Sequence, residues 1–163
     1  MKVVRKQRNS RMCIICGLDN EYGVQAPFYV MEDGSVMTRF AFRERHQSYP
    51  GRVHGGMIAA MLDELGLRSL WIETDDIFGV TTGMTTRFKQ PVPYGVSLKG
   101  KGQIIKNSPL FVESRAEIYD EENRLLASAE IRYLKMPVER IQEGISYHEE
   151  MCYLVEDGVK EID

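Results

Sequence analysis

The stretch YPGRVHGGMIAAMLDELG, residues 49 to 66, decides the fold of this chain. A Pro-Gly turn leads into His-Gly-Gly, and apolar residues dominate afterwards, so the pattern predicts a helix over about residues 55 to 72. The apolar residues spread around most of the helical circumference, which is typical of a buried helix. Asp63 and Glu64 stand in the middle of it. An ionised side chain costs several kcal/mol in such a place unless it is paired, so each carboxylate needs a partner or a function.

The two carboxylates are adjacent, and adjacent residues point about 100° apart on a helix, so they do not serve one site together. We expect one to face a cavity or a subunit boundary and the other to form a salt bridge or face solvent. An exposed polar strip explains both equally well on periodicity alone. The start at His54, Gly55 and Gly56 favours a function, because uncovered N–H groups at the positive end of a helix can hold an oxyanion. A carboxylate and an oxyanion hole are parts that acyl transfer needs.

Strand patterns lie on both sides of the helix. The runs PFYVMED and SVMTRFAF, separated by Asp33 and Gly34, predict a hairpin before it. The turn signals QPVPYG, KNSP and DEENR then separate four further predicted strands, at 78–89, 96–106, 110–119 and 125–135. Hairpins without crossover helices form an antiparallel sheet. We therefore predict an α+β fold, with a curved antiparallel sheet of about six strands wrapped around a long central helix.

The composition narrows the class of protein. The chain has 163 residues, 43% of them hydrophobic, which suits one compact core. A formal net charge of -3 argues against a nucleic-acid partner. No segment approaches the roughly 20 apolar residues of a membrane span, and the basic N-terminus lacks the apolar run of a signal peptide. We expect a cytoplasmic protein with no membrane partner.

The two ends of the chain differ from its centre. Residues 1–26 form a basic lead-in with a Cys-x-x-Cys pair, residues 27–136 are the predicted domain, and residues 137–163 are an acidic C-terminal extension. VERIQEG predicts a short helix at the start of that extension, and the rest is expected to lack fixed structure.

Cys13 and Cys16 raise the question of a metal. They could supply half of a zinc site, but no second pair stands at ligand spacing and the three histidines form no tight cluster. A redox pair would sit at the start of a helix after a strand, whereas a turn-rich segment follows here. Two part-buried thiols are therefore the preferred interpretation, and neither a metal nor a cofactor is expected.

Several segments together resemble a known family. GRVHGGMIAAMLDE is followed by VTTGMTTRFKQPVPYG and RLLASAEIRYLK, and CIICGLDNEYGV precedes them. This combination, over roughly residues 12 to 136, resembles the hotdog-fold acyl-CoA thioesterases of the PaaI-like type. The resemblance implies hydrolysis of an acyl-CoA thioester to a free acid and CoA. It also implies a homodimer, often doubled to a tetramer, with the site at the subunit interface.

The resemblance also implies roles for residues of the motifs. Asp63 would activate water or attack the thioester carbonyl, and the backbone N–H of Gly55 would polarise that carbonyl. Thr81 would position the water, with Thr82 as the neighbouring candidate. His54 would shape the loop or contact the thioester. In the family, Asp of one subunit faces the Thr strand and the Gly of the other.

Substrate contacts are implied less directly. Ser48 stands where many members have Asn, and it cannot present an amide. The turn IIKNSPL keeps only Lys106 as a phosphate contact, so that role could pass to Arg87, Lys89 or the basic N-terminus, although a solvated charge strip is the commoner reason for such residues. The residues expected to bind substrate are Ser48, Gly56, Thr82, Arg87, Lys89, Lys106 and Asn107.

Two other functions stay open. Hotdog dehydratases use a His before the helix and an acid on it, which His46 in HQSYPG and Glu64 imitate loosely. A hotdog protein that binds acyl-CoA without turnover is the non-enzyme alternative.

Overall fold

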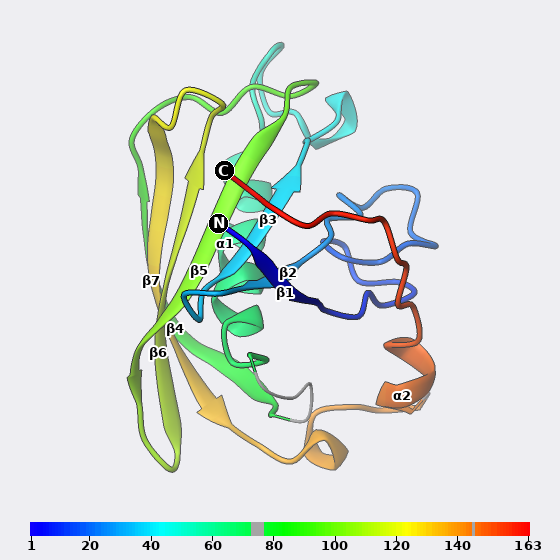
Figure 1. Cartoon of the computed structure of the whole chain (residues 1–163). Helices are drawn as coiled ribbons and strands as arrows, with labels where there is room; N and C mark the ends of the chain where they lie inside the picture. The colour runs from blue at the N-terminus through cyan, green and yellow to red at the C-terminus, as the bar shows by residue number, and fades with distance from the viewer. Residues whose placement is uncertain (73–76, 145) are drawn as a thin grey trace.

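The computed structural model describes residues 1–72, 77–144 and 146–163. Its centre is the helix α1 (Gly55–Arg68), which lies against one face of a curved antiparallel sheet (Figure 1). The strands of the described residues are β1 (Val3–Lys6), β2 (Tyr29–Met31), β3 (Val36–Phe40), β4 (Gly79–Phe88), β5 (Leu98–Asn107), β6 (Phe111–Tyr119) and β7 (Leu125–Lys135). Two 3-10 turns, η1 (Glu44–His46) and η2 (Val138–Arg140), and a short helix, α2 (Tyr147–Glu150), complete the described elements.

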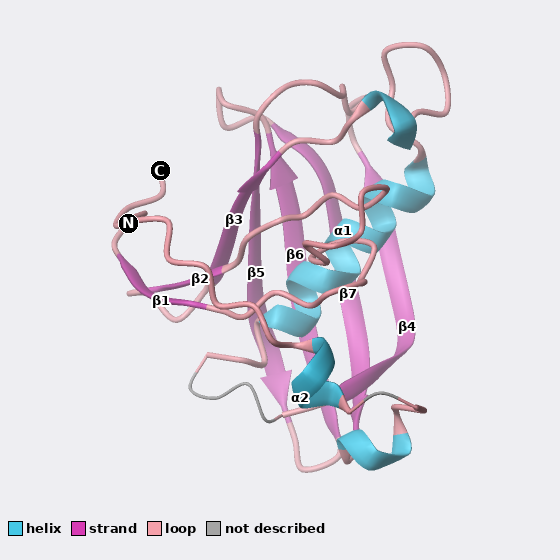
Figure 2. Cartoon of the chain, turned by 90° about the vertical axis from the view of Figure 1, so that its right-hand side faces the viewer, coloured by secondary structure: helices cyan, strands magenta, loops and turns pink. Residues whose placement is uncertain are grey.

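The strand order is β1-β2-β3-β5-β6-β7-β4, so β4 and β1 form the two edges of the sheet (Figure 2). The predicted α+β hotdog architecture is confirmed, and each of the four strands predicted after the helix agrees with the structure to within about two residues. The helix ends at Arg68 rather than near residue 72. Ser69 closes it with an N–H bond to the Gly66 carbonyl, and a tight turn then carries the chain to Trp71.

Glycines let the helix approach the sheet closely. A Cβ atom on Gly102 of β5 would lie 2.3 Å from the backbone oxygen of Leu65, so only glycine fits there. On the helix, a Cβ atom on Gly66 would lie 2.3 Å from the hydroxyl of Tyr133. Met61, Leu62 and Leu65 are completely buried on this side of α1. The helix therefore rests directly on the sheet.

The opposite side of α1 is only partly covered by the described residues. Gly56 is exposed, and Ala59, Ala60 and Asp63 are half-buried. This corrects the prediction of a helix buried all round. The apolar residues on the outer side need a neighbour that one chain does not supply among its described residues.

The two chain ends lie side by side (Figure 1). The basic N-terminal segment, for which no strand was predicted, pairs with β2 as β1. Lys6 of β1 forms a salt bridge of 2.5 Å with Asp157, and Ile162 of the acidic extension is buried. The expectation that this extension lacks fixed structure was therefore wrong, because β1 and β2 give it a surface to pack against. None of the helices in the described residues is long and apolar enough to cross a membrane.

Candidate active site

Asp63 lies on the outer side of α1, next to the edge strand β4. The hydroxyl of Thr81, on β4, donates to its carboxylate, with Oγ1 at 2.9 Å from Oδ1 and 3.1 Å from Oδ2. The hydroxyl of Tyr133, on β7, donates to the backbone oxygen of Asp63 at 2.8 Å. Thr81 and Tyr133 are paired across β4 and β7. Two neighbouring strands thus hold this turn of the helix and its carboxylate in place.

The carboxylate of Asp63 is a better base than an ordinary aspartate. Its pKa is raised, chiefly because burial disfavours the charged form; the Thr81 hydrogen bond lowers it and the charge of Glu64 raises it. A carboxyl group with a raised pKa, next to a hydroxyl that can orient water, is what general-base chemistry requires.

Glu64 has a different environment. Its Oε1 lies 2.8 Å from Nε of Arg68, whose guanidinium is completely buried. The Arg68 charge also lies over the rings of Phe28 and Trp71, at 4.7 and 4.5 Å from their centroids. The predicted salt bridge of one carboxylate is confirmed for Glu64, whereas Asp63 lies beside Thr81 of the edge strand β4.

The start of α1 keeps an unused backbone donor. Nδ1 of His54 accepts from the N–H of Gly56 at 2.9 Å, and the His54 carbonyl accepts from Met57 and Ile58. This leaves the N–H of Gly55 without an acceptor among the described residues. Gly55 lines a cavity of about 340 Å³ together with Ile58, Phe88 and Lys89. His54 therefore acts as the helix cap that shapes this turn, and the free donor lies where a ligand could reach it.

Gly55 and Asp63 of one chain are too far apart to act on one atom. Eight residues of helix separate them, which corresponds to about 12 Å. Thr81, in contrast, contacts Asp63 of its own chain. The implied arrangement, in which Thr81 would reach Asp63 from the other subunit, is corrected on this point.

The expected substrate contacts fall at two ends of the sheet. Arg87 and Lys89 are exposed at the end of β4, where Lys89 joins Gly55 in the cavity. Asn107 lies at the opposite end of the sheet, level with Thr81. It pairs with Val112 of β6, Val112 pairs with Tyr133 of β7, and Tyr133 pairs with Thr81 of β4. Its Oδ1 accepts from Nζ of Lys135 at 2.6 Å, and the adjacent Lys106 is exposed.

The remaining expected contacts have backbone partners. The Ser48 N–H donates to the Arg52 carbonyl at 2.9 Å, and the Ser48 residue is exposed. The Thr82 hydroxyl donates to the Arg132 carbonyl at 3.1 Å, away from Asp63. In the basic N-terminus, Arg5 donates to the Trp71 carbonyl, and Lys6 is paired as described above. Among these, only Ser48 lies near the start of α1.

His46 and Glu64, the two residues considered for a dehydratase, both have hydrogen-bond partners within the chain. His46 is buried, its Nδ1 accepts from the N–H of Arg43 at 3.1 Å, and its Nε2 lies 2.7 Å from the Tyr22 carbonyl. Both ring nitrogens are therefore used by the loop, and Glu64 is used by Arg68.

Sequence reasoning missed Tyr133. The sequence did contain a hint of its role. Tyr133 occupies an inward position of a strand, and a buried phenol needs a hydrogen-bond partner. The partner, a helix carbonyl exposed next to Gly66, could be found only from the packing.

Comparisons with known proteins agree with this fold. Residues 50–127 match the family model described as the thioesterase superfamily. No curated protein gives a significant sequence match. A solved thioesterase-superfamily protein superposes with a TM-score of 0.69 at 23% identity over 76% of this chain, and the match spans 63% of that protein.

Two further structures are similar. A phenylacetic acid degradation-related protein from Ralstonia eutropha has a TM-score of 0.61 at 19% identity, with 68% of this chain and 85% of that chain covered. A hypothetical thioesterase protein from Streptococcus pneumoniae, solved with coenzyme A, has a TM-score of 0.62 at 18% identity, with 69% and 89% covered. At these identities the structural likeness establishes the fold. This chain therefore has the hotdog fold, and its central segment, residues 50–127, is similar to the thioesterase superfamily.

Proposed function

We propose that this protein hydrolyses acyl-CoA thioesters to a free acid and CoA. The observation that supports this most is the half-buried carboxylate of Asp63, held by Thr81 at the open edge of a fold shared with thioesterases. A carboxylate in that position can activate water, and the helix start offers a backbone donor for the oxyanion.

In the general-base route, Asp63 takes a proton from water, and the resulting hydroxide attacks the thioester carbonyl. The oxygen of the tetrahedral intermediate accepts from the N–H of Gly55. The C–S bond then breaks, and the CoA thiolate takes up the proton. In the nucleophilic route, the carboxylate itself attacks and expels CoA, and water hydrolyses the mixed anhydride.

The site needs a second subunit. About 12 Å of helical rise separates Gly55 from Asp63 in one chain, so we propose that a carbonyl that touches both groups takes them from different subunits. The outer edge of β4 has no strand partner among the described residues. Long open edges normally require a covering partner. We therefore propose a two-fold homodimer that pairs the β4 edges and covers the outer side of α1, with further doubling to a tetramer.

Such a dimer would also bring basic residues from the two ends of the sheet close together. Arg87 and Lys89 lie at the Gly55 end of one chain, whereas Lys106 and Lys135 lie at the Thr81 end. A two-fold axis would bring the Gly55 end of one subunit toward the Thr81 end of the other. Both sets could then contact the CoA phosphates, which supports CoA as the leaving group.

Asp63→Asn tests the carboxylate. Asn has the same volume but cannot take a proton, so thioester hydrolysis should fall about a hundredfold or more while acyl-CoA binding and folding persist. Thiol release should be measured over short, long and aromatic acyl-CoAs. Glu130→Gln is the control, because this exposed acid forms only a surface pair with Arg115. Wild-type turnover in Asp63→Asn would contradict the proposal.

The same assay separates the alternatives. Tight binding of acyl-CoA that stays intact after long incubation would indicate a binding protein. Loss of enoyl absorbance without thiol release would indicate a hydratase.

Gly55→Pro and Gly55→Ala form a matched pair for the oxyanion donor. Proline is accepted at the first helical position and removes only the N–H, and the His54 backbone, at φ -64 and ψ 134, suits a residue before proline. A Cβ atom at this position meets the Phe88 ring at an ordinary 3.5 Å. We expect Gly55→Pro to lower kcat by about 10²-fold, and Gly55→Ala, which keeps the N–H, to lower it far less. Equal kcat in the two variants would exclude the Gly55 donor.

A further inference from the structure

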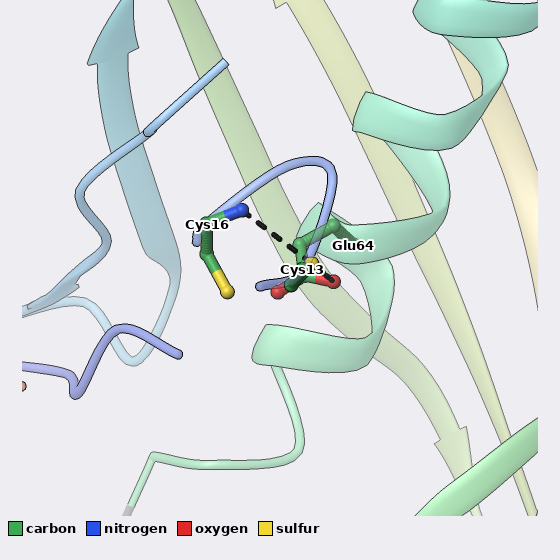
Figure 3. Close-up of side chains that lie close together, drawn as sticks. All are labelled: Cys13, Cys16 and Glu64. Atoms are coloured by element: carbon green, nitrogen blue, oxygen red, sulfur yellow. Dashed lines mark hydrogen bonds between the residues drawn. The ribbon is translucent and has the colours of Figure 1, made fainter. Parts of the chain in front are cut away.

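Cys13, Cys16 and Glu64 form a cluster beside α1 (Figure 3). One ligand atom from each residue lies within 4.8 Å of the other two. The Sγ of Cys13 is 4.0 Å from Oε2 of Glu64. The third member comes from the helix, 51 residues away in the chain, so the spacing of cysteines and histidines could not reveal it.

The backbone around the cysteines favours a thiolate. The N–H groups of Ile15 and Cys16 point at Sγ of Cys13, at 3.3 and 3.5 Å. The tight turn is closed by the N–H of Gly17 on the Cys13 carbonyl at 2.8 Å. A Cβ atom on Gly17 would lie 2.4 Å from that carbonyl oxygen, so the turn requires glycine. N–H donors aimed at sulfur stabilise its charged form.

Arg68 supplies a fixed positive charge behind the cluster. It binds Oε1 of Glu64, which leaves Oε2 on the side of Cys13. The guanidinium is completely buried, and its Nη2 has no hydrogen-bond partner among the described residues. It also interacts electrostatically with Cys16. Two thiolates, one carboxylate and one guanidinium carry a net charge of about -2, which a divalent cation would neutralise.

We propose that Cys13, Cys16 and Glu64 bind a zinc ion that ties the N-terminal lead-in to helix α1. Thiolate and carboxylate ligands in this number suit Zn²⁺, and the fourth position would hold water. Tetrahedral Zn²⁺ bonds of about 2.0–2.3 Å place ligand atoms roughly 3.3–3.8 Å apart, compared with 4.0 Å between Sγ of Cys13 and Oε2 of Glu64 and at most 4.8 Å within the cluster. Arg68 would act as the outer partner that orients the carboxylate. Binding displaces the thiol protons to solvent, so it weakens as pH falls.

Metal content of the purified full-length protein is the first test. We expect about one zinc per chain by elemental mass spectrometry. Cys13→Ser and Cys16→Ser should lose most of it, and Cys152→Ser should not, because Cys152 is exposed and outside the cluster. Replacement by Co²⁺ should give the absorption of a tetrahedral thiolate site. A chelator should lower Tm of the wild type by about 5 °C or more.

Alkylation of the wild type avoids variants that fail to fold. Bound Zn²⁺ should protect Cys13 and Cys16 from iodoacetamide, whereas Cys152 in the same sample should react. Peptide mass spectrometry reads all three. The proposal is overturned if the reduced, metal-free protein fails to take up Zn²⁺ in titration, whether its two thiols stay free or form a Cys13–Cys16 disulfide.

Discussion

At the scale of single residues, the adjacent carboxylates Asp63 and Glu64 point in different directions from the helix and meet different partners. Glu64 meets a buried guanidinium that neutralises its charge. Asp63 meets a hydroxyl at the open side of the sheet, and burial raises its pKa. A carboxylate without a cationic partner retains its basicity, so the proposed function assigns the proton transfer to Asp63, whereas Glu64 forms a salt bridge.

Thr81→Ala should move the pH dependence of hydrolysis. The Thr81 hydrogen bond lowers the pKa of Asp63, so its loss should raise that pKa further and shift the acid limb of kcat/KM to higher pH. The loss of a hydrogen bond to a charged group should also lower kcat/KM about tenfold or more. Thr81→Ser, which keeps the hydroxyl, should retain the wild-type profile. An acid limb at the same pH in Thr81→Ala would show that Thr81 does not act through Asp63.

Asp63→Asn should change stability in a pH-dependent manner. A folded-state pKa above the ordinary 3.8 means that the native protein holds this proton more tightly than the unfolded chain. The wild type therefore loses stability as pH rises from about 3.8 through the raised pKa. Asn has no charge to bury, so Asp63→Asn should be more stable than the wild type at pH 7. Below the ordinary pKa of aspartate, this gain should disappear. Thermal unfolding at both pH values measures it, and a gain that is equal at both would contradict a raised pKa.

At the scale of elements, the packing of α1 on β5 depends on the absence of side chains. The backbone of Leu65 approaches Gly102 so closely that any Cβ atom must displace the helix. Fourteen residues of helix, with the candidate carboxylate in the middle, are positioned by this contact. A substitution here should affect the site through the backbone.

Gly102→Ala should destabilise the protein by about 1–3 kcal/mol or more, because the obstructing atom is backbone and cannot rotate away. Gln103→Ala is the matched control, since Gln103 is the next residue on the same strand and is exposed. Urea unfolding of both variants gives the comparison. Equal free energies of unfolding would show that the helix can shift without cost.

At the scale of the whole molecule, the described residues leave the β4 edge unpaired and the outer side of α1 incompletely covered, and about 12 Å of helical rise separates Gly55 from Asp63. The proposed two-fold partner would account for all three. A dimer that pairs the β4 edges would complete the sheet and the site in one step.

Mixing two inactive variants tests the shared site. Asp63→Asn subunits keep Gly55, and Gly55→Pro subunits keep Asp63, so each mixed dimer would contain one intact site. After joint refolding of equal amounts, activity should recover to roughly a quarter of the wild-type value, because half of the random dimers are mixed and each has one good site. A mixture as inactive as its components would mean that both groups act within one subunit, and a stable monomer in sedimentation would do the same.

Thr81 was a candidate only through the family resemblance. The sequence by itself determined the order of the elements, the start of the central helix and the residues Asp63 and Gly55 as candidates. These follow from local signals, because a short stretch of sequence is enough to recognise the hydrophobic period of a strand or a helix, a Pro-Gly turn or a helix start at His-Gly-Gly. Only the tertiary structure decided which carboxylate meets Arg68 and which meets Thr81. It also decided that Glu64 joins the cysteine pair and that Asp157 of the acidic extension binds Lys6 of β1. Those contacts join residues far apart in the chain, and such pairings leave no local pattern, since they depend on how the sheet curves around the helix.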